Sequence, residues 1–401
     1  MHSEKKAARR PGALLVLSAA LLFTIGFESA GYQSVVLPVS EQFHFGAAGI
    51  GRIVSVQYFA VMVFSFFLGR LADRVGKKPA LRLALLLFLA GCCVCLIPGP
   101  LALFAFGIFL TGGGYGSIEG LSNAALVDHD PARADQALNV TQFAFSIGAF
   151  VSPLACSAAL RRGADWRFPF LVCGVLGLVL FAALRAVPFS RRPAAAPAGE
   201  TRGVPAAGRP RGALFPVAAS IFFYVGIEIG ISYFNGVFFS DVLGKPAYAA
   251  YALSLFWLSM GASRLFFGLV RVRAERTILL CQFLLAAAIG LLTAVRSVWP
   301  ALGLMAVIGA AAGPIWPLLV STAVRSCPDA SGATSGVMTL SSGLGGAVVP
   351  LLFGYLSETV SIRVSYWTLA GFSAAGFALM LLRRAKRRAA GREKTNAARK
   401  F

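Results

Sequence analysis

Three glutamates, Glu28, Glu119 and Glu228, lie well inside long apolar stretches of this 401-residue chain. An acidic side chain at the centre of a membrane helix costs roughly 3 kcal/mol, so it persists where it faces water, finds a partner or holds a proton. Removal from water favours the protonated form of a carboxylic acid. Each glutamate is therefore a candidate proton carrier. The alternative is a neutral glutamate that only hydrogen-bonds to a neighbouring helix.

Neutral hydrogen-bonding side chains follow each glutamate on the same predicted helix face. They are Tyr32 after Glu28, Asn123 after Glu119, and Ser232 and Asn235 after Glu228. Residues three or four positions apart are neighbours on a helix surface. An acid beside hydroxyl and amide groups suits a ligand that carries hydroxyl groups, so we expect these side chains to contact a substrate.

Two further residues have two interpretations each. Trp316 could stack on the face of a sugar ring, or it could be an aromatic residue of the core. Arg264, late in an apolar stretch, could extend its cation to the membrane surface or act in a gate, or it could contact a ligand. We favour the surface or gate role for Arg264.

The elements that must position these residues are apolar helices. The chain is 57% apolar and 13% charged, against about 25% charged in a typical soluble protein. A spanning helix needs roughly 20 apolar residues. Twelve such segments can be placed, at about 12–39, 48–69, 80–97, 101–127, 136–160, 167–187, 213–240, 247–271, 277–295, 299–323, 332–356 and 362–382. We therefore expect an all-α integral membrane protein with twelve transmembrane helices.

The predicted helices fall into two groups. Residues 189–212 are rich in Pro, Ala, Gly and Arg without apolar periodicity, which predicts a cytoplasmic linker. The linker separates a six-helix bundle in residues 1–188 from a second bundle in residues 213–383, and a basic tail follows in residues 384–401.

An internal repeat supports this division. Four short matches recur in the same order at offsets of 197 to 200 residues. In one of them Gly26 and Glu28 return as Gly226 and Glu228, and in the same repeat Trp316 takes the position of Glu119. Such an offset indicates two pseudo-symmetric halves related by an axis along the membrane normal.

The formal charge of +21 reflects membrane orientation rather than nucleic-acid binding. If the N-terminus is cytoplasmic, 29 of the 37 Lys and Arg residues lie on the cytoplasmic side and 7 on the other. This asymmetry follows the positive-inside rule. We expect a multi-pass protein of the cell membrane with both termini in the cytoplasm, and a tail that touches anionic lipid.

The sequence shows few signs of a catalytic site or a metal site. The seven cysteines lie mostly in apolar segments and predict no disulfide framework or metal site. The glycine cluster at 112–116 lacks the Gly-Lys-Ser/Thr ending of a phosphate loop. None of the three histidines lies within a predicted span, so no catalytic Ser/His/Asp set is visible. We expect neither an enzyme nor a cofactor.

Residues 69–81 combine two glycines, one carboxylate and four cations between two apolar segments, which predicts a short loop. The stretch resembles the loop between helices two and three of the major facilitator superfamily. The resemblance implies a gate in which Asp73 accepts hydrogen bonds at a helix N-terminus near residues 331–333, where the helix dipole favours an anion. The other residues of this gate are Gly69, Arg70, Arg74 and Gly76, with the two arginines pairing with acids or carbonyls. The alternative is an anchor that only sets topology.

A narrower resemblance involves the candidate site. The patterns Tyr115-Gly-x-Ile-Glu119-x-x-x-Asn123 and Leu138-Asn139-x-x-Gln142 are similar to the fucose/galactose/glucose:proton symporter family. The resemblance implies that Glu119 is the buried proton acceptor, that Glu28 is a more accessible carboxylate, and that Gln142 contacts the substrate.

We therefore predict a secondary transporter of the major facilitator fold. It would move a small neutral solute, with a sugar as one candidate, by proton-coupled alternating access. The proton gradient would supply the energy, and we expect the chain to act as a monomer. The alternative is a proton-driven exporter of drugs or metabolites, since exporters also use buried acids.

Overall fold

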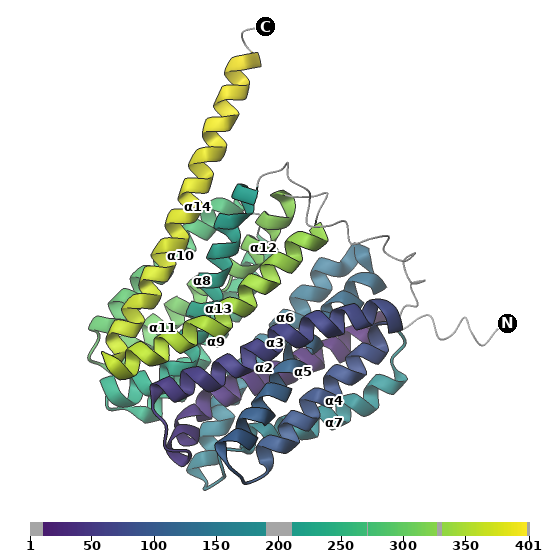
Figure 1. Cartoon of the computed structure of the whole chain (residues 1–401), viewed down its shortest axis with the longest axis vertical. Coiled ribbons are helices and arrows are strands. Elements are labelled where there is room, and N and C mark those ends of the chain that lie inside the picture. Colours follow the sequence, from purple (N-terminus) through teal and green to yellow (C-terminus); the bar gives the residue numbers. More distant parts are fainter. Residues whose placement is uncertain (1–10, 190–210, 271, 327–330, 399–401) are drawn as a thin grey trace, which may run out of the picture.

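The computed structural model describes residues 11–189, 211–270, 272–326 and 331–398. Within these ranges, twelve helical segments are long and apolar enough to cross a membrane. The predicted linker at 189–212 lies almost entirely outside the described residues. Figure 1 shows the first six spans and the last six as two groups of long helices side by side.

The helices of the first bundle are α2 (Pro11–Gln42), α3 (Ala47–Val75), α4 (Lys77–Leu96), α5 (Leu101–His129), α6 (Ala134–Arg161) and α7 (Phe168–Ala186). A short helical turn, η1 (Pro131–Arg133), precedes α6. These bounds agree with the predicted segments to within a few residues, except around residue 76.

The second bundle contains α8 (Arg211–Val237), α9 (Ala249–Leu269), α10 (Ala274–Ala294), α11 (Val298–Ala312), α12 (Ile315–Ser326), α13 (Ser331–Thr359) and α14 (Ile362–Ala398). The turns η2 (Phe238–Val242) and η3 (Pro246–Tyr248) connect α8 to α9. α11 and α12 together form one span. Its break falls at Gly313 and Pro314, because proline lacks the N–H that a continuous helix requires.

The prediction of a loop over residues 69–81 is wrong for most of that stretch. α3 continues to Val75 and α4 begins at Lys77, so Gly76 alone separates them. Gly76 has a φ of 92°, which glycine adopts without steric cost, and its N–H donates to the carbonyl of Ala72. The preceding residues all tolerate a helix, so the helix extends past the apolar segment until the backbone reverses at this glycine.

Glycine contacts give the internal repeat a structural meaning. A Cβ on Gly148 of α6 would lie 2.1 Å from the carbonyl oxygen of Phe23 in α2. A Cβ on Gly345 of α13 would lie 2.2 Å from the carbonyl oxygen of Phe222 in α8. The matched glycines therefore allow equivalent helix pairs to approach closely in each bundle.

The two ends of the bundles differ in how tightly α3 and α13 pack. We call the end that carries the start of α2 and the end of α14 the terminal face, and the other end the opposite face. Near the opposite face the N–H of Ala48 donates to Glu358 at 2.8 Å, and a Cβ on Gly51 would lie 2.3 Å from the carbonyl oxygen of Pro350. Near the terminal face a Cβ on Gly69 or Gly336 would meet no atom within 4 Å. The two helices thus diverge towards the terminal face (Figure 1).

α6 and α9 form the other long contact between the bundles. The hydroxyl of Ser254 donates to the carbonyl of Phe150 at 2.9 Å near the opposite face. A Cβ on Gly268, near the terminal face, would lie 3.4 Å from the side chain of Asn139. On this side the bundles stay together along most of their length.

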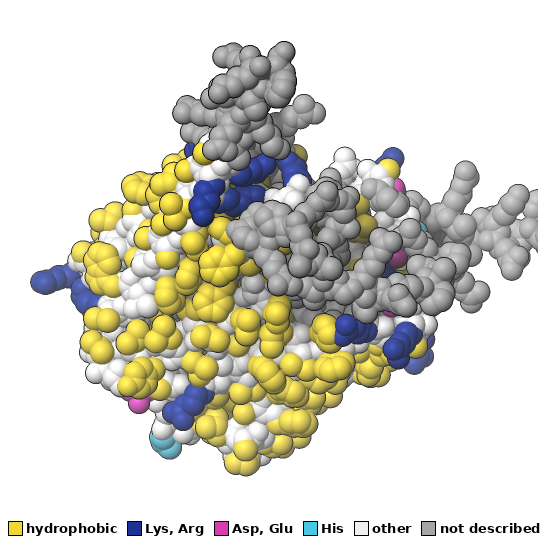
Figure 2. Space-filling view, turned by 45° about the horizontal axis from the view of Figure 1, so that its top comes forward, with side chains coloured by type: hydrophobic (Ala, Val, Ile, Leu, Met, Phe, Trp, Pro, Cys, Tyr) yellow, Lys and Arg dark blue, Asp and Glu magenta, His cyan; other side chains and the backbone are white. Residues whose placement is uncertain are grey.

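The outer surface matches a membrane location. Figure 2 shows hydrophobic side chains over much of the flank, whereas Lys and Arg side chains gather where α14 leaves the bundle. An apolar flank of this extent avoids water by facing lipid. The chain is an all-α, multi-pass membrane protein.

Candidate functional site

Glu28 lies at the interface of the two bundles and is fully buried. Its Oε1 accepts a hydrogen bond from Nε2 of Gln57 in α3 at 3.3 Å. The Oε1 of Gln57 accepts in turn from the hydroxyl of Tyr233 in α8 at 2.6 Å. The second oxygen of Glu28 is buried without a hydrogen-bond partner among the described residues. One amide therefore joins an acid of the first bundle to a phenol of the second.

A second amide makes a similar connection one turn further along α2. Nε1 of Trp257 in α9 donates to Oε1 of Gln33 at 3.0 Å. The ring of Tyr32 packs edge-on against Tyr233, with centroids 5.4 Å apart. The hydroxyl of Tyr32 is buried and has no hydrogen-bond partner in the described part of the chain. Tyr32 thus packs in an aromatic interface between the bundles.

Glu119 and Gln142 lie in contact across α5 and α6. Nε2 of Gln142 in α6 donates to Oε1 of Glu119 in α5 at 3.1 Å. Both side chains are partly exposed. Asn123 lies one turn further along α5, and its Oδ1 is buried without a partner among the described residues. This oxygen is an acceptor that a ligand hydroxyl could use.

The order of accessibility is the reverse of what the resemblance implied. Glu28 is fully buried, whereas Glu119 is partly exposed. In this structure Glu119, and not Glu28, is therefore the more accessible carboxylate.

Glu228 and Arg264 form an ion pair across α8 and α9. The closest distance, from Nη2 to Oε2, is 3.9 Å, and both side chains are about one-fifth exposed. Nε of Arg264 also donates to the carbonyl of Gly313 at 3.2 Å, at the break between α11 and α12. Arg264 of α9 therefore bonds α8 and the break between α11 and α12.

These groups converge on one central region. Glu119 lies within electrostatic range of both Arg264 and Glu228. Tyr58 of α3 and Tyr115 of α5 lie within electrostatic range of all three glutamates. Both tyrosines are partly exposed. The acids predicted from the sequence thus meet between the bundles, together with phenol and amide groups.

Three predicted substrate contacts make bonds within the protein. Ser232 donates to the carbonyl of Ile229 in its own helix at 3.3 Å, and Asn235 donates to the carbonyl of Ala249 at 2.7 Å. Nε1 of Trp316 donates to the hydroxyl of Ser342 in α13 at 3.4 Å, while the indole stays 40% exposed. Trp316 is therefore the most available of the three for a ligand.

The predicted gate lies at the terminal face. Asp73 and Arg74 are exposed, and the guanidinium of Arg70 lies 3.9 Å from the ring centroid of Phe66. The side chains of residues 331–333, the predicted partners of Asp73, lie outside those the structure describes. Within the described part of the chain Asp73 makes no ion pair. The gate remains a prediction. In this structure α3 and α13, the two helices that it would join, lie apart at the terminal face.

Sequence reasoning missed Gln57, Tyr233, Gln33 and Trp257. The signal was present for the two glutamines, since each is a polar residue inside an apolar segment. The aromatic partners carried no such signal, because an aromatic side chain does not stand out in an apolar segment. Among the described residues no group of three His, Cys, Asp or Glu side chains could hold a metal ion.

The sequence has relatives among known transporters. The chain is 25% identical over 389 residues to a glucose/galactose transporter of Brucella abortus biovar 1 (strain 9-941), a match that covers 91% of this chain and 93% of that protein. It is 27% identical over 170 residues to a gentisate transporter of Corynebacterium glutamicum, covering 41% of this chain but only 38% of that protein.

The fold has close counterparts among solved structures. The nucleoside transporter NupG superposes with a TM-score of 0.73 at 16% identity, over 92% of this chain and 99% of that one. The sequence pattern of the Major Facilitator Superfamily matches residues 16–273 and, in a second match, residues 217–400. This chain belongs to the Major Facilitator Superfamily.

Proposed function

We propose that this transporter couples the movement of a small neutral solute to the movement of protons. The main support for this proposal is that Glu28 and Glu119 are each hydrogen-bonded to a neutral amide and, in the described part of the chain, not to a cation, at 3.3 Å and 3.1 Å. Glu28 is fully buried with no cation among the described residues bonded to it, and removal from water favours the protonated form of an acid, whereas an N–H donated by an amide favours the carboxylate. Each acid would release its proton when the surrounding helices admit water.

Alternating access is supported by the difference between the two ends of the bundles. α3 and α13 are bonded near the opposite face, where Ala48 contacts Glu358, and are apart near the terminal face at Gly69 and Gly336. A rocking motion that reversed this pattern would expose Glu28 and enclose Glu119. The two acids would then face water in turn.

A sugar is our preferred solute. The central region offers the Oδ1 of Asn123, which has no partner among the described residues, the amide of Gln142 and the partly exposed rings of Tyr58 and Tyr115, and Trp316 of α12 has an exposed indole. Amides and phenols suit hydroxyl groups, and an indole face suits the apolar face of a sugar ring. The match to a glucose/galactose transporter along nearly the whole chain supports the same class.

We also propose that the terminal face is cytoplasmic and that the protein acts as a monomer in the cell membrane. The orientation rests on the 29 Lys and Arg residues that this arrangement places in the cytoplasm. No cofactor is needed in this proposal, because the proton gradient drives transport. A cysteine-labelling experiment in intact cells, with reagents that cannot cross the membrane, tests the orientation.

Uptake into proteoliposomes tests the function. Vesicles with an acidic exterior and a neutral lumen should accumulate labelled glucose or galactose above the external concentration, and a proton ionophore should abolish the accumulation. Outward movement of a lipophilic dye under the same gradient, without sugar uptake, would show an exporter instead. Equilibration of sugar without accumulation would exclude proton coupling.

A further inference from the structure

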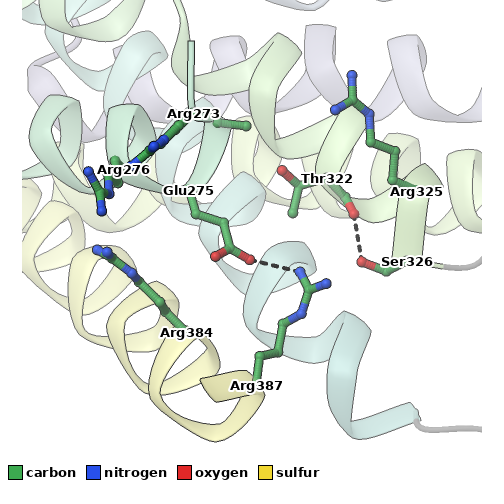
Figure 3. Close-up of a pocket in the computed structure, with 9 residues that line it drawn as sticks. Arg273, Glu275, Arg276, Thr322, Arg325, Ser326, Arg384 and Arg387 are labelled. Carbon is green, nitrogen blue, oxygen red and sulfur yellow. Dashed lines mark hydrogen bonds and ion pairs between the residues drawn. The ribbon is translucent and has the colours of Figure 1, made fainter. Parts of the chain in front are cut away.

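A pocket of about 480 Å³ lies at the terminal face of the second bundle, far from the central site. Three spans end around it, since α10 begins, α12 ends and α14 continues towards the C-terminus there. Figure 3 shows side chains from all three helices around the pocket, with Glu275 and Arg387 bonded near its centre and Arg325 extending away from them. We call it the arginine pocket, and its lining residues are Arg273, Ala274, Glu275, Arg276, Thr322, Arg325, Ser326, Arg384 and Arg387.

The lining is strongly cationic, with five arginines and one glutamate. The glutamate is already used, because Oε1 of Glu275 bonds Nη1 of Arg383 at 3.0 Å and Nη1 of Arg387 at 2.9 Å. Within the described part of the chain, the remaining lining arginines have no acidic partner. Convergent like charges repel one another, so an anion that entered the pocket would be stabilised.

A buried arginine holds this arrangement in place. Arg383 is only 5% exposed, and its Nη2 donates to the hydroxyl of Ser326 at 2.7 Å. Its Nε is buried without a partner among the described residues. By bonding both Glu275 and Ser326, Arg383 fixes α14 against α10 and α12. Arg384 and Arg387 on the same helix are thereby positioned at the pocket.

The chemistry of the pocket suits a phosphate group. A guanidinium presents a planar pair of N–H donors that matches two oxygens of a phosphate, and several can bind one multiply charged anion. α10 starts at Ala274 in the lining, so the positive end of its dipole also favours an anion. Because three apolar spans end here, the pocket lies at the depth where a membrane has its lipid phosphates.

We propose that the arginine pocket binds a phosphate group, presented by the headgroup of an anionic phospholipid or by a soluble organic phosphate. The site lies outside the central region and does not depend on the proposed transport function. Occupation would neutralise the arginines and strengthen the attachment of α14 to α10 and α12.

Native mass spectrometry of the purified full-length chain tests the proposal. Phosphatidylglycerol should bind more tightly than zwitterionic phosphatidylcholine, with no transported solute present. Arg276→Gln/Arg325→Gln removes two exposed lining arginines that take no part in the Glu275 ion pairs. This double variant should weaken phosphatidylglycerol binding by roughly tenfold or more at low salt.

The matched control is Arg133→Gln/Arg185→Gln, which removes two exposed arginines from the first bundle with the same change of net charge. It should keep binding close to that of the unmodified chain. Displacement of the lipid by inorganic phosphate or glycerol 3-phosphate would assign the pocket to soluble phosphates, and lack of displacement would assign it to lipid. Equal binding by the two double variants would overturn the proposal.

Discussion

Glu28 and Tyr233 belong to different bundles, yet both are bonded to the single side-chain amide of Gln57. The amide nitrogen donates to the acid at 3.3 Å and the amide oxygen accepts the phenol at 2.6 Å. A change in the protonation of Glu28 would therefore act, through the amide of Gln57, on a bond that joins the two bundles.

Tyr233→Phe removes the phenol donor and leaves the buried amide oxygen of Gln57 unpaired. We expect this variant to lower the free energy of unfolding by about 1 kcal/mol or somewhat more. Tyr32→Phe is the matched control, because the hydroxyl of Tyr32 is buried without a partner among the described residues. Its loss should be neutral or slightly stabilising. Thermal melting of both purified variants checks this. Equal shifts of the two melting temperatures would contradict a stabilising hydrogen bond between Tyr233 and Gln57.

Glu119→Gln keeps the hydrogen-bonding shape of the side chain but removes its ability to exchange a proton. We expect proton-driven accumulation to be lost, while exchange of preloaded sugar for external sugar remains measurable. Glu41→Gln, at an exposed position near the opposite face, is the control and should accumulate normally. Full accumulation of sugar by the Glu119→Gln variant would show that Glu119 is not required for proton coupling.

The Glu228–Arg264 pair is partly exposed and its closest distance is 3.9 Å. Removal of one partner leaves the other charge uncompensated in the membrane interior, so each of Glu228→Gln and Arg264→Gln should cost about 1–3 kcal/mol of stability. The double variant should cost less than the sum of the two single changes. A double-mutant cycle on the melting temperatures measures the coupling, and strict additivity would show that the pair does not interact.

Gly345→Ala should destabilise the protein by about 1–3 kcal/mol, because its Cβ would lie 2.2 Å from the carbonyl oxygen of Phe222. The backbones of α13 and α8 would have to move apart. Gly371→Ala, in a helical position of α14 with no atom within 4 Å, is the control and should be neutral or slightly stabilising. Thermal melting of the two variants distinguishes close packing from a general requirement for glycine.

Asp73→Asn tests the predicted gate at the terminal face. If Asp73 closes that face by binding a helix N-terminus, its neutralisation should favour the conformation in which α3 and α13 are apart. A cysteine introduced by Gly336→Cys, at a position open in this structure, should then react faster with a water-soluble reagent. Asp241→Asn, an exposed change near the opposite face, should leave the rate unchanged. An unchanged rate in Asp73→Asn would leave the residue as a topology anchor.

Much of the fold could be predicted from sequence because its signals are local. Runs of apolar residues indicate spans one at a time, and cation counts indicate orientation without any knowledge of packing. Gly148 and Gly345 were recognisable as repeat partners for the same reason. The acids Glu28, Glu119 and Glu228 were visible as candidates because a carboxylate is costly in any membrane helix.

The tertiary structure decided how these residues are combined. Gln57 and Tyr233 are 176 positions apart, and no local pattern relates them. The burial of Glu28 and the partial exposure of Glu119 depend on how the surrounding helices pack, which the local sequence does not show. The arginine pocket likewise collects residues from three separate helices. Sequence determines which side chains must avoid lipid, whereas only the packed helices determine which of them meet.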